Sequence, residues 1–237
     1  MKKISYCNDF FKNRSGLSSH AASEVFKILK ENLPHLSSVV DVGCGTGTWL
    51  ATFQQSGVST IKGYDGYLTD LSLLEIPEKD FIHHDLKKHI HSTEKFDLAI
   101  CLEVAEHLHE DDAFTLVSSI CSLSDFVLFS AAIPGQGGQN HFNEKWQSYW
   151  IDLFNCHNFS TIDCIRSKIW DDPKIPFWYK QNSFLMVKNN TNFSYNYDNN
   201  SIISNLVHPD LFQHKCTVQP NNTRSFKRFL KEIFLKA

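Results

Sequence analysis

The sequence predicts an α/β fold: one open, mostly parallel β-sheet with helices on both faces. Short, strongly apolar runs alternate along the chain with segments whose apolar residues recur at helical spacing, and this alternation is typical of parallel sheets. A glycine cluster, VGCGTG, follows the first apolar run and precedes a helical segment, the usual position of a ligand-binding loop in such sheets. Hydrophobic residues make up 42% of the 237 residues, enough for a sizeable core.

The expected helices have an amphipathic pattern and recognisable ends. The first starts at serine, the second closes at Gly57, and the fourth carries Trp146, Trp150, Leu153 and Phe154 on one stripe. We expect helices over 18–33, 48–57, 111–123 and 143–158. The apolar runs between and after them predict strands over 37–43, 60–65, 80–85, 95–103, 125–133, 161–170 and 182–188.

Charge and composition argue against several classes of protein. The net charge of −3 does not indicate binding of nucleic acid through bulk electrostatics. No apolar run reaches 18 residues, and the two lysines at the start are not followed by the apolar stretch of a secretory signal. The seven cysteines are scattered without a Cys-x-x-Cys pair, which favours reduced thiols. We therefore expect a cytoplasmic protein without a transmembrane segment.

An Asn-rich stretch over 188–200 predicts a linker, so we expect one α/β domain over 1–188 and a tail over 189–237. The tail ends in FKRFLKEIFLK, where basic and apolar residues alternate at helical spacing. Such a segment either docks its apolar stripe on protein or lies on an anionic membrane surface.

The glycine loop places Gly43, Gly45 and Gly47 between a strand and a helix, with Asp41 just before them. Glycines at this position let the backbone turn sharply and approach a ligand closely. A nicotinamide-binding loop has the spacing G-x-G-x-x-G and seats a pyrophosphate on the helix end. Here the spacing is G-x-G-x-G, and a neighbouring carboxylate repels a pyrophosphate but suits a cationic ligand.

This pattern resembles motif I of the class I S-adenosylmethionine-dependent methyltransferases, whose cofactor carries an ammonium group and a sulfonium. FDLAICLEVAEHL resembles motif IV of the same family, and the resemblance covers roughly residues 15–188. It implies a Rossmann-like sheet of seven strands with only the last strand antiparallel. It also implies a set of cofactor-binding residues: Asp41, Gly43, Cys44, Gly45, Thr46, Gly47, Asp65, Gly66, Asp85, Leu86, Leu102 and Glu103. Within that set, Asp65 is expected at the ribose hydroxyls and Asp85 near the adenine amino group.

The segment EVAEH places Glu103, Glu106 and His107 at spacings that share one face of a helical turn. It follows the fourth strand, where open α/β sheets bind ligands. His141, in the loop after the fifth strand, is expected beside the same strand end. We expect these four residues to line the acceptor side, with Glu106, His107 and His141 as the catalytic candidates.

Three roles remain open for this group. His107 or His141 can act as a general base that takes the proton of an acceptor hydroxyl. Glu103, Glu106, His107 and His141 can instead hold one divalent ion, Mg²⁺, Mn²⁺ or Zn²⁺, that lowers the pKa of the hydroxyl. Glu-x-x-Glu-His with a later histidine is similar to the metal-binding arrangement of methyltransferases acting on the terminal ribose of small RNAs. In many other class I enzymes a similar motif only shapes the pocket.

The resemblance extends to a bacterial subgroup of small-molecule methyltransferases through SAAIPGQGGQNHFNEKWQSYW and WYKQN (178–182). We therefore expect methyl transfer to a small-molecule oxygen, a sugar or glycan hydroxyl, with Trp178 and Tyr179 forming an apolar wall or a stacking platform. Two alternatives stay open. One is an RNA 2′-O-methyltransferase with a divalent metal, against which the α/β body shows no basic stripe. The other is a nicotinamide-dependent oxidoreductase or a catalytically inactive binding module.

Overall fold

The computed structural model describes residues 8–33, 35–66, 70–191 and 205–216, and the side chains from residue 16 onward. The chain divides into two compact units, Met1–Leu206 and Val207–Ala237. In the second unit the described part is helix α7 (Pro209–Cys216) and the two residues before it. Most of the expected Asn-rich linker and the expected basic amphipathic segment lie outside the described residues, so both stay predictions.

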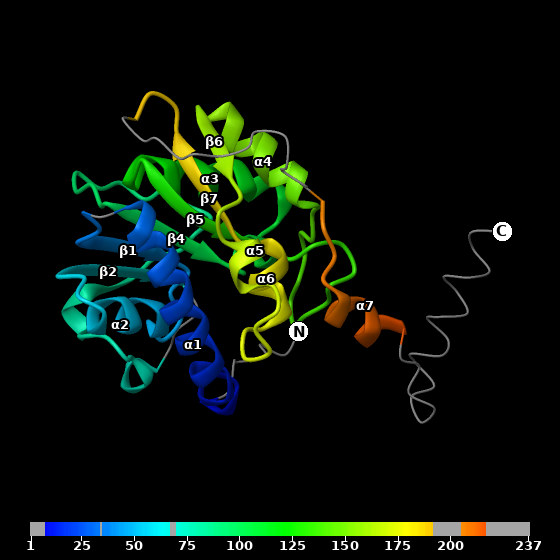
Figure 1. Cartoon of the computed structure of the whole chain (residues 1–237). Coiled ribbons are helices and arrows are strands. Elements are labelled where there is room, and N and C mark those ends of the chain that lie inside the picture. Colours follow the sequence, from blue (N-terminus) through cyan, green and yellow to red (C-terminus); the bar gives the residue numbers. More distant parts are fainter. Residues whose placement is uncertain (1–7, 34, 67–69, 192–204, 217–237) are drawn as a thin grey trace, which may run out of the picture. The chain divides into compact units, whose positions relative to one another are not determined.

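The first unit is built on a seven-stranded sheet with the order β3-β2-β1-β4-β5-β7-β6 (Figure 1). All neighbouring pairs are parallel except those of β7, which runs antiparallel to both β5 and β6. This topology confirms the fold expected from the sequence. The strands are β1 (Ser38–Val42), β2 (Thr60–Asp65), β3 (Phe81–His83), β4 (Leu98–Leu102), β5 (Phe126–Ser130), β6 (Phe159–Ile162) and β7 (Phe184–Lys188).

Adjacent residues of the strands face two separate hydrophobic layers, as the period-two geometry of a strand requires. In β1, Val39 packs into the layer that also contains side chains of α1, α2, α5 and α6, whereas Val40 packs with α3 and α4. The helices therefore cover both faces of the sheet (Figure 1). They are α1 (Asn8–Asn32), α2 (Thr48–Gln55), α3 (Glu110–Leu123), α4 (Gln147–Cys156), α5 (Arg166–Ile169) and α6 (Phe177–Asn182).

The segment 161–170 differs from the strand that its apolar residues predict, because the chain leaves the sheet after Ile162 and α5 follows. Asp163 accepts hydrogen bonds from the guanidinium of Arg166, three residues on, which favours a turn at this point. The same guanidinium lies 4.2 Å from the ring centroid of Phe184 and is buried there. A buried cation with these partners stabilises a helical turn in place of a continued strand.

Two further expectations about helices are wrong in detail, the start of the first helix and the place of Trp146. Helix α1 begins ten residues earlier than the sequence pattern indicates. Helix α6 occupies the stretch that contains WYKQN, to which the sequence pattern assigned no helix. Trp150 and Phe154 pack into the core, but Trp146 precedes α4 as its N-cap residue and is 42% exposed. In the part of the chain that the structure describes, no helix has the length and apolar character needed to cross a bilayer.

Candidate active site

The residues singled out by the sequence gather at the carboxyl ends of four neighbouring strands. The glycine loop follows β1, Asp65 ends β2, Glu103 follows β4, and the loop carrying His141 follows β5. Strand β1 lies between β2 and β4, so the order of the strands reverses beside it. Open α/β sheets bind their ligands at this switch point.

All three loop glycines have left-handed backbone conformations, with φ of 90° at Gly43, 56° at Gly45 and 84° at Gly47. A Cβ atom at Gly43 would lie 2.3 Å from a methyl carbon of Val104, and one at Gly47 would lie 2.9 Å from Ile76. The loop therefore needs glycine both for its conformation and for close approach. The first contact also shows that the loop lies directly against the EVAEH segment.

The loop is anchored to β2 through its backbone. The amides of Gly43 and Cys44 both donate to the carbonyl of Tyr64, and the amide of Gly45 donates to Asp65 Oδ2 at 2.9 Å. The thiol of Cys44 points into the core, where a Cβ atom on Gly63 would meet its Sγ at 2.7 Å. Cys44 thus contributes backbone to this site, while its side chain packs between α2 and β2.

Thr46 and Thr48 bind a carboxylate that the sequence pattern did not single out. Glu75 Oε1 accepts hydrogen bonds from Thr46 Oγ1 at 3.1 Å and Thr48 Oγ1 at 2.6 Å. The amide of Glu75 donates in turn to the carbonyl of Thr46. Because Thr48 is the first residue of α2, the carboxylate lies at the N-terminal end of that helix, where a negative charge is favourable.

Two acidic side chains lie beneath the loop. Asp41 is 4% exposed and Asp65 is 7% exposed. Burial raises the pKa of the Asp41 carboxyl well above its ordinary value, and the neighbouring charge of Asp65 adds to this shift. A cation placed between the two would relieve both effects, because an opposite charge favours the ionised form. The residues therefore fit the ammonium and ribose groups of S-adenosylmethionine.

The remaining expected cofactor residues differ in position. Gly66 follows Asp65 and leaves room for the carbonyl of His84, which would lie 2.8 Å from an added Cβ. Asp85 is exposed and accepts the amide of Lys87, which makes it a turn residue as well as a candidate for the adenine. Leu86 is buried and Leu102 is half-buried.

Glu103 lies outside the short 3₁₀ turn formed by Ala105–His107, so the three residues of EVAEH do not share one helical face as expected. Its φ of 55° is unusual for a residue with a side chain. Gln136 Nε2 donates to its Oε2 at 2.7 Å, and Asn182 Nδ2 donates to its Oε1 at 3.1 Å. Burial raises the pKa of Glu103, against the opposing effect of these amide donors.

Glu106 is fully buried, and neither carboxylate oxygen accepts a hydrogen bond of good geometry. Burial raises its pKa well above the ordinary value, and the nearby charge of Glu103 raises it further. The backbone amides of Glu106 and Ala132 lower it, but by less. A buried carboxylate in this state requires a proton or a cation, since an uncompensated charge there is costly.

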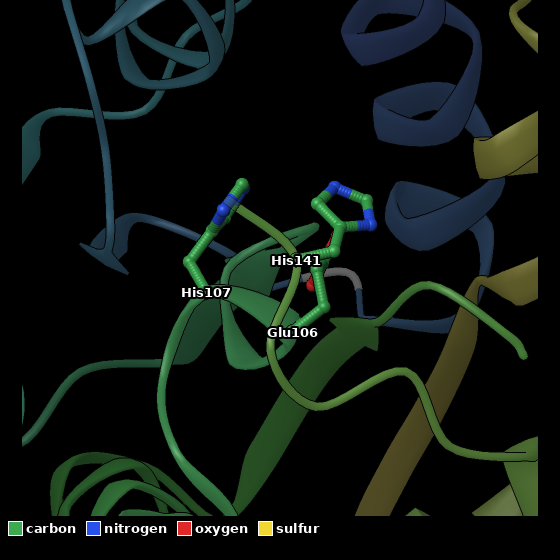
Figure 2. Close-up of side chains that lie close together, drawn as sticks. All are labelled: Glu106, His107 and His141. Carbon is green, nitrogen blue, oxygen red and sulfur yellow. The ribbon is translucent and has the colours of Figure 1, made fainter. Parts of the chain in front are cut away.

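His107 and His141 lie side by side above Glu106, with ring centroids 4.9 Å apart and ring planes nearly perpendicular, at 86° (Figure 2). His107 Nδ1 lies 3.2 Å from the carbonyl oxygen of Asn140, and His141 Nδ1 lies 3.0 Å from Glu144 Oε1. One ligand atom each of Glu106, His107 and His141 fall within 4.8 Å of one another. The structure thus brings together three of the four expected residues, and the carboxylate of Glu103 is not part of this group.

A cluster of buried amides behind Glu103 was missed by sequence reasoning. Gln136 Oε1 accepts hydrogen bonds from Gln181 Nε2 and Asn182 Nδ2, both at 3.0 Å. All three side chains are at most 8% exposed. The available signal was the pair Gln181-Asn182 next to aromatic residues, but only the packing of α6 against the loop after β5 reveals their common partner.

Comparisons with known proteins agree with this geometry. A family model described as a methyltransferase domain matches residues 15–158, which is more than half of the chain. The chain therefore belongs to this family: it is a class I S-adenosylmethionine-dependent methyltransferase. A search of curated protein sequences returned no match.

Three solved structures illustrate the shared fold. The amino pentose methyltransferase CalS10 from Micromonospora echinaspora, with S-adenosylmethionine bound, superposes with a TM-score of 0.59 at 12% identity, covering 79% of this chain and 100% of that chain. The sugar N-methyltransferase KedS8 from Streptoalloteichus superposes with a TM-score of 0.60 at 14% identity, covering 79% of this chain and 95% of that chain. The methyltransferase domain of bacterial CtHen1 superposes with a TM-score of 0.52 at 17% identity, covering 72% of this chain and 97% of that chain.

Proposed function

We propose that this methyltransferase acts on a hydroxyl group of a small-molecule acceptor, a sugar or glycan. The observation that carries the proposal is the contact between Gly43 and Val104, which leaves no room for a Cβ atom. It joins the methyl-donor loop to the segment that carries Glu106 and His107. The loop proposed to bind the donor and the reactive side chains therefore lie next to each other at the carboxyl ends of β1 and β4.

On the donor side, Asp65 holds the ribose hydroxyls and Asp41 faces the ammonium group. When bound, S-adenosylmethionine supplies an electrophilic methyl group on a sulfonium. Glu75 favours this cofactor over a dinucleotide, because its carboxylate already lies at the N-terminus of α2. A pyrophosphate normally binds at such a helix end, and here it would meet a negative charge.

On the acceptor side, the two imidazoles are arranged to receive a proton. The Nδ1 partner of His107 is a carbonyl and that of His141 is a carboxylate, and neither group can donate when the carboxylate is ionised. In a neutral imidazole the hydrogen is then on Nδ1 and the lone pair on Nε2. Either ring can hold the proton that an acceptor hydroxyl must lose.

A divalent ion is a second form of the same chemistry, supported by the unpartnered carboxylate of Glu106 beside two imidazoles. This ligand set of one oxygen and two nitrogens suits Zn²⁺ or Mn²⁺ better than Mg²⁺, which prefers oxygen. An ion held by Glu106, His107 and His141 would lower the pKa of a hydroxyl bound to it. Glu103 would not be a ligand of this ion, since its two carboxylate oxygens accept hydrogen bonds from the side-chain amides of Gln136 and Asn182.

The proposed acceptor is supported by the proteins of similar structure and by the net charge of the chain. CalS10 is described as an amino pentose methyltransferase and KedS8 as a sugar N-methyltransferase. Both descriptions support a sugar acceptor and make an amino group the alternative to a hydroxyl. The net charge of −3 disfavours an RNA acceptor.

The test combines binding and turnover. Titration calorimetry should show micromolar binding of S-adenosylhomocysteine and none of NAD. Methyl transfer is then measured on sugars matched in pairs, in which one hydroxyl is replaced by an amine. Preference for the hydroxyl member supports the proposal, and transfer only to the amine overturns it.

A chelator distinguishes the two forms of hydroxyl activation. If a metal acts, chelation abolishes turnover and Mn²⁺ or Zn²⁺ restores it. If a histidine acts alone, the chelator has no effect, and activity falls as pH drops through the range of about 6.5 where imidazoles are protonated. Full activity of both His107→Ala and His141→Ala, with and without chelator, would contradict both forms.

A further inference from the structure

We infer that Glu144 is a positioning residue that fixes the ring orientation and tautomer of His141, so that the hydrogen is on Nδ1 and the lone pair is on Nε2. This inference rests on the proposed function, in which His141 is a reacting group. It assigns a role to an acid that neither the glycine loop nor the EVAEH motif includes.

The carboxylate of Glu144 accepts hydrogen bonds from two amides of its own loop and lies beside the ring of His141. Oε2 accepts from the amide of Gly135 at 2.8 Å, Oε1 accepts from the amide of Gly137 at 2.6 Å, and Oε1 also lies 3.0 Å from His141 Nδ1. The side chains of His141 and Glu144 are only 12% and 20% exposed. The two amides hold the carboxylate in place, so it is a fixed partner for the imidazole.

This partner decides the tautomer. A carboxylate that accepts two backbone amides cannot donate to Nδ1, so the hydrogen of a neutral imidazole must be on Nδ1. Nε2 then carries the lone pair, whether it receives a proton or binds a metal ion. Carboxylate–histidine pairs of this kind fix the orientation of the ring.

Gly138 provides the second constraint on the ring. A Cβ atom at Gly138 would lie 2.1 Å from Nε2 of His141 and 2.4 Å from Cε1. The imidazole therefore packs directly on the glycine, opposite its bond to Glu144. Gly138 is not among the glycines with positive φ, so alanine is compatible with the backbone there and only the ring has to move.

The Nδ1 atom of His107 faces the uncharged carbonyl of Asn140, at 3.2 Å. A carboxylate stabilises an imidazolium more strongly than a carbonyl does, since a charge-assisted hydrogen bond is about twice as strong as a neutral one. The Nδ1 atoms of the two histidines thus face different groups, a carbonyl at His107 and a carboxylate at His141.

The tautomer can be measured without any acceptor. Long-range ¹H–¹⁵N correlation spectra of the ¹⁵N-histidine-labelled protein distinguish Nδ1–H from Nε2–H rings, and His141→Gln assigns the signal. Above about pH 7.5, where imidazoles are mostly neutral, the Nδ1–H form of His141 is expected in the wild type. It should shift toward Nε2–H in Glu144→Ala, which leaves no side-chain acceptor beside Nδ1, and stay unchanged in the control Glu110→Ala, an exposed acid paired with Lys145. An Nε2–H ring in the wild type would overturn the inference.

Kinetics supply the second readout. Glu144→Ala removes the fixed acceptor, and Gly138→Ala displaces the ring while keeping every titratable group. Both should lower kcat by about 10–100-fold, the usual cost of losing such a partner, with the dissociation constant of S-adenosylhomocysteine within twofold of wild type. Wild-type kcat in both variants would overturn the inference. Absence of methyl transfer in the wild type itself would instead count against the proposed function, and the tautomer would still decide the role of Glu144.

Discussion

Glu103 and Glu106 show how far two identical side chains, three residues apart, can differ in one site. Glu103 has a left-handed backbone and two amide donors, whereas Glu106 is fully buried without a hydrogen-bond partner. The side-chain amides of Gln136 and Asn182 partly offset the burial of Glu103, whereas no side-chain donor among the described residues bonds Glu106. The second carboxylate is therefore the one that calls for a ligand or a proton.

Stability should depend on pH through Glu106. Its folded-state pKa is raised, so its stabilising contribution is complete below the unfolded value of about 4.5 and is lost as pH rises toward the folded value. The Glu106→Gln side chain cannot ionise, so the variant does not lose this stabilising contribution as pH rises. The free energy of unfolding of the metal-free variant, relative to wild type, should increase with pH by up to about 1.4 kcal/mol per unit. Denaturant titrations between pH 5 and 8 (roughly the window of maximal stability) measure this, with Glu110→Gln as the control; parallel curves would contradict it.

Asp65 should contribute to binding of the methyl donor. Asp65→Ala removes charge-assisted hydrogen bonds to the ribose, each worth roughly 1.5–3 kcal/mol, so affinity should fall about tenfold or more. It also removes the acceptor of the Gly45 amide, which orders the loop. Titration with S-adenosylhomocysteine measures the effect, and the exposed acid Glu78 provides a control variant. An unchanged dissociation constant would remove Asp65 from the cofactor site.

At the scale of elements, the glycine loop is held from two sides. The end of β2 binds its amides, and the segment before β3 binds its threonine hydroxyls through Glu75. The second contact joins the loop to the first turn of α2, so loop and helix are oriented together. We expect this connection to preorganise the donor site without touching the acceptor.

Glu75→Ala should therefore weaken donor binding and leave the chemical step intact. Loss of the two hydroxyl contacts costs about 1 kcal/mol for this exposed side chain, which corresponds to roughly fivefold in KM for S-adenosylmethionine. The value of kcat at saturating donor should stay unchanged, with Glu78→Ala as the comparison. A fall in kcat without a change in KM would show that Glu75 acts on catalysis and not on the loop.

At the scale of the molecule, the expected boundary at Lys188 cuts off residues that bind α4. Asn205 Oδ1 accepts the amide of Ser148 at 3.0 Å, and the carbonyl of Leu206 accepts Gln147 Nε2 at 2.9 Å. Both hydrogen bonds are made by donors in the first turn of α4, the backbone amide of Ser148 and the buried side-chain amide of Gln147. The described residues that support the sheet domain thus extend to Leu206.

Two truncations test this extent. A chain ending at Leu206 should keep the wild-type Tm. A chain ending at Lys188 should still fold cooperatively, but the lost contacts cost about 2 kcal/mol, which lowers Tm by roughly 4–8 °C. Thermal denaturation followed by circular dichroism compares them. Equal Tm values would place the boundary at Lys188, and loss of a cooperative transition would show that the tail belongs to the core.

The sequence by itself determined the sheet and the donor loop. Both depend on local patterns: β1 is a short valine-rich run, and Gly43, Gly45 and Gly47 have backbone conformations that other residues avoid. Asp65 was predictable for the same reason, since it ends a strand next to that loop. Such patterns predict structure because they depend on the backbone geometry of neighbouring residues and not on tertiary contacts.

Only the tertiary structure decided how the acceptor side is divided. Glu103 and Glu106 have the same chemistry in the sequence, and their different surroundings come from Gln136 and Asn182, which lie 33 and 79 positions away from Glu103. The role of Glu144 likewise depends on a loop that folds back on its carboxylate. Hydrogen bonding and desolvation in a buried site are set by whichever groups the fold brings together, and spacing along one segment does not encode them.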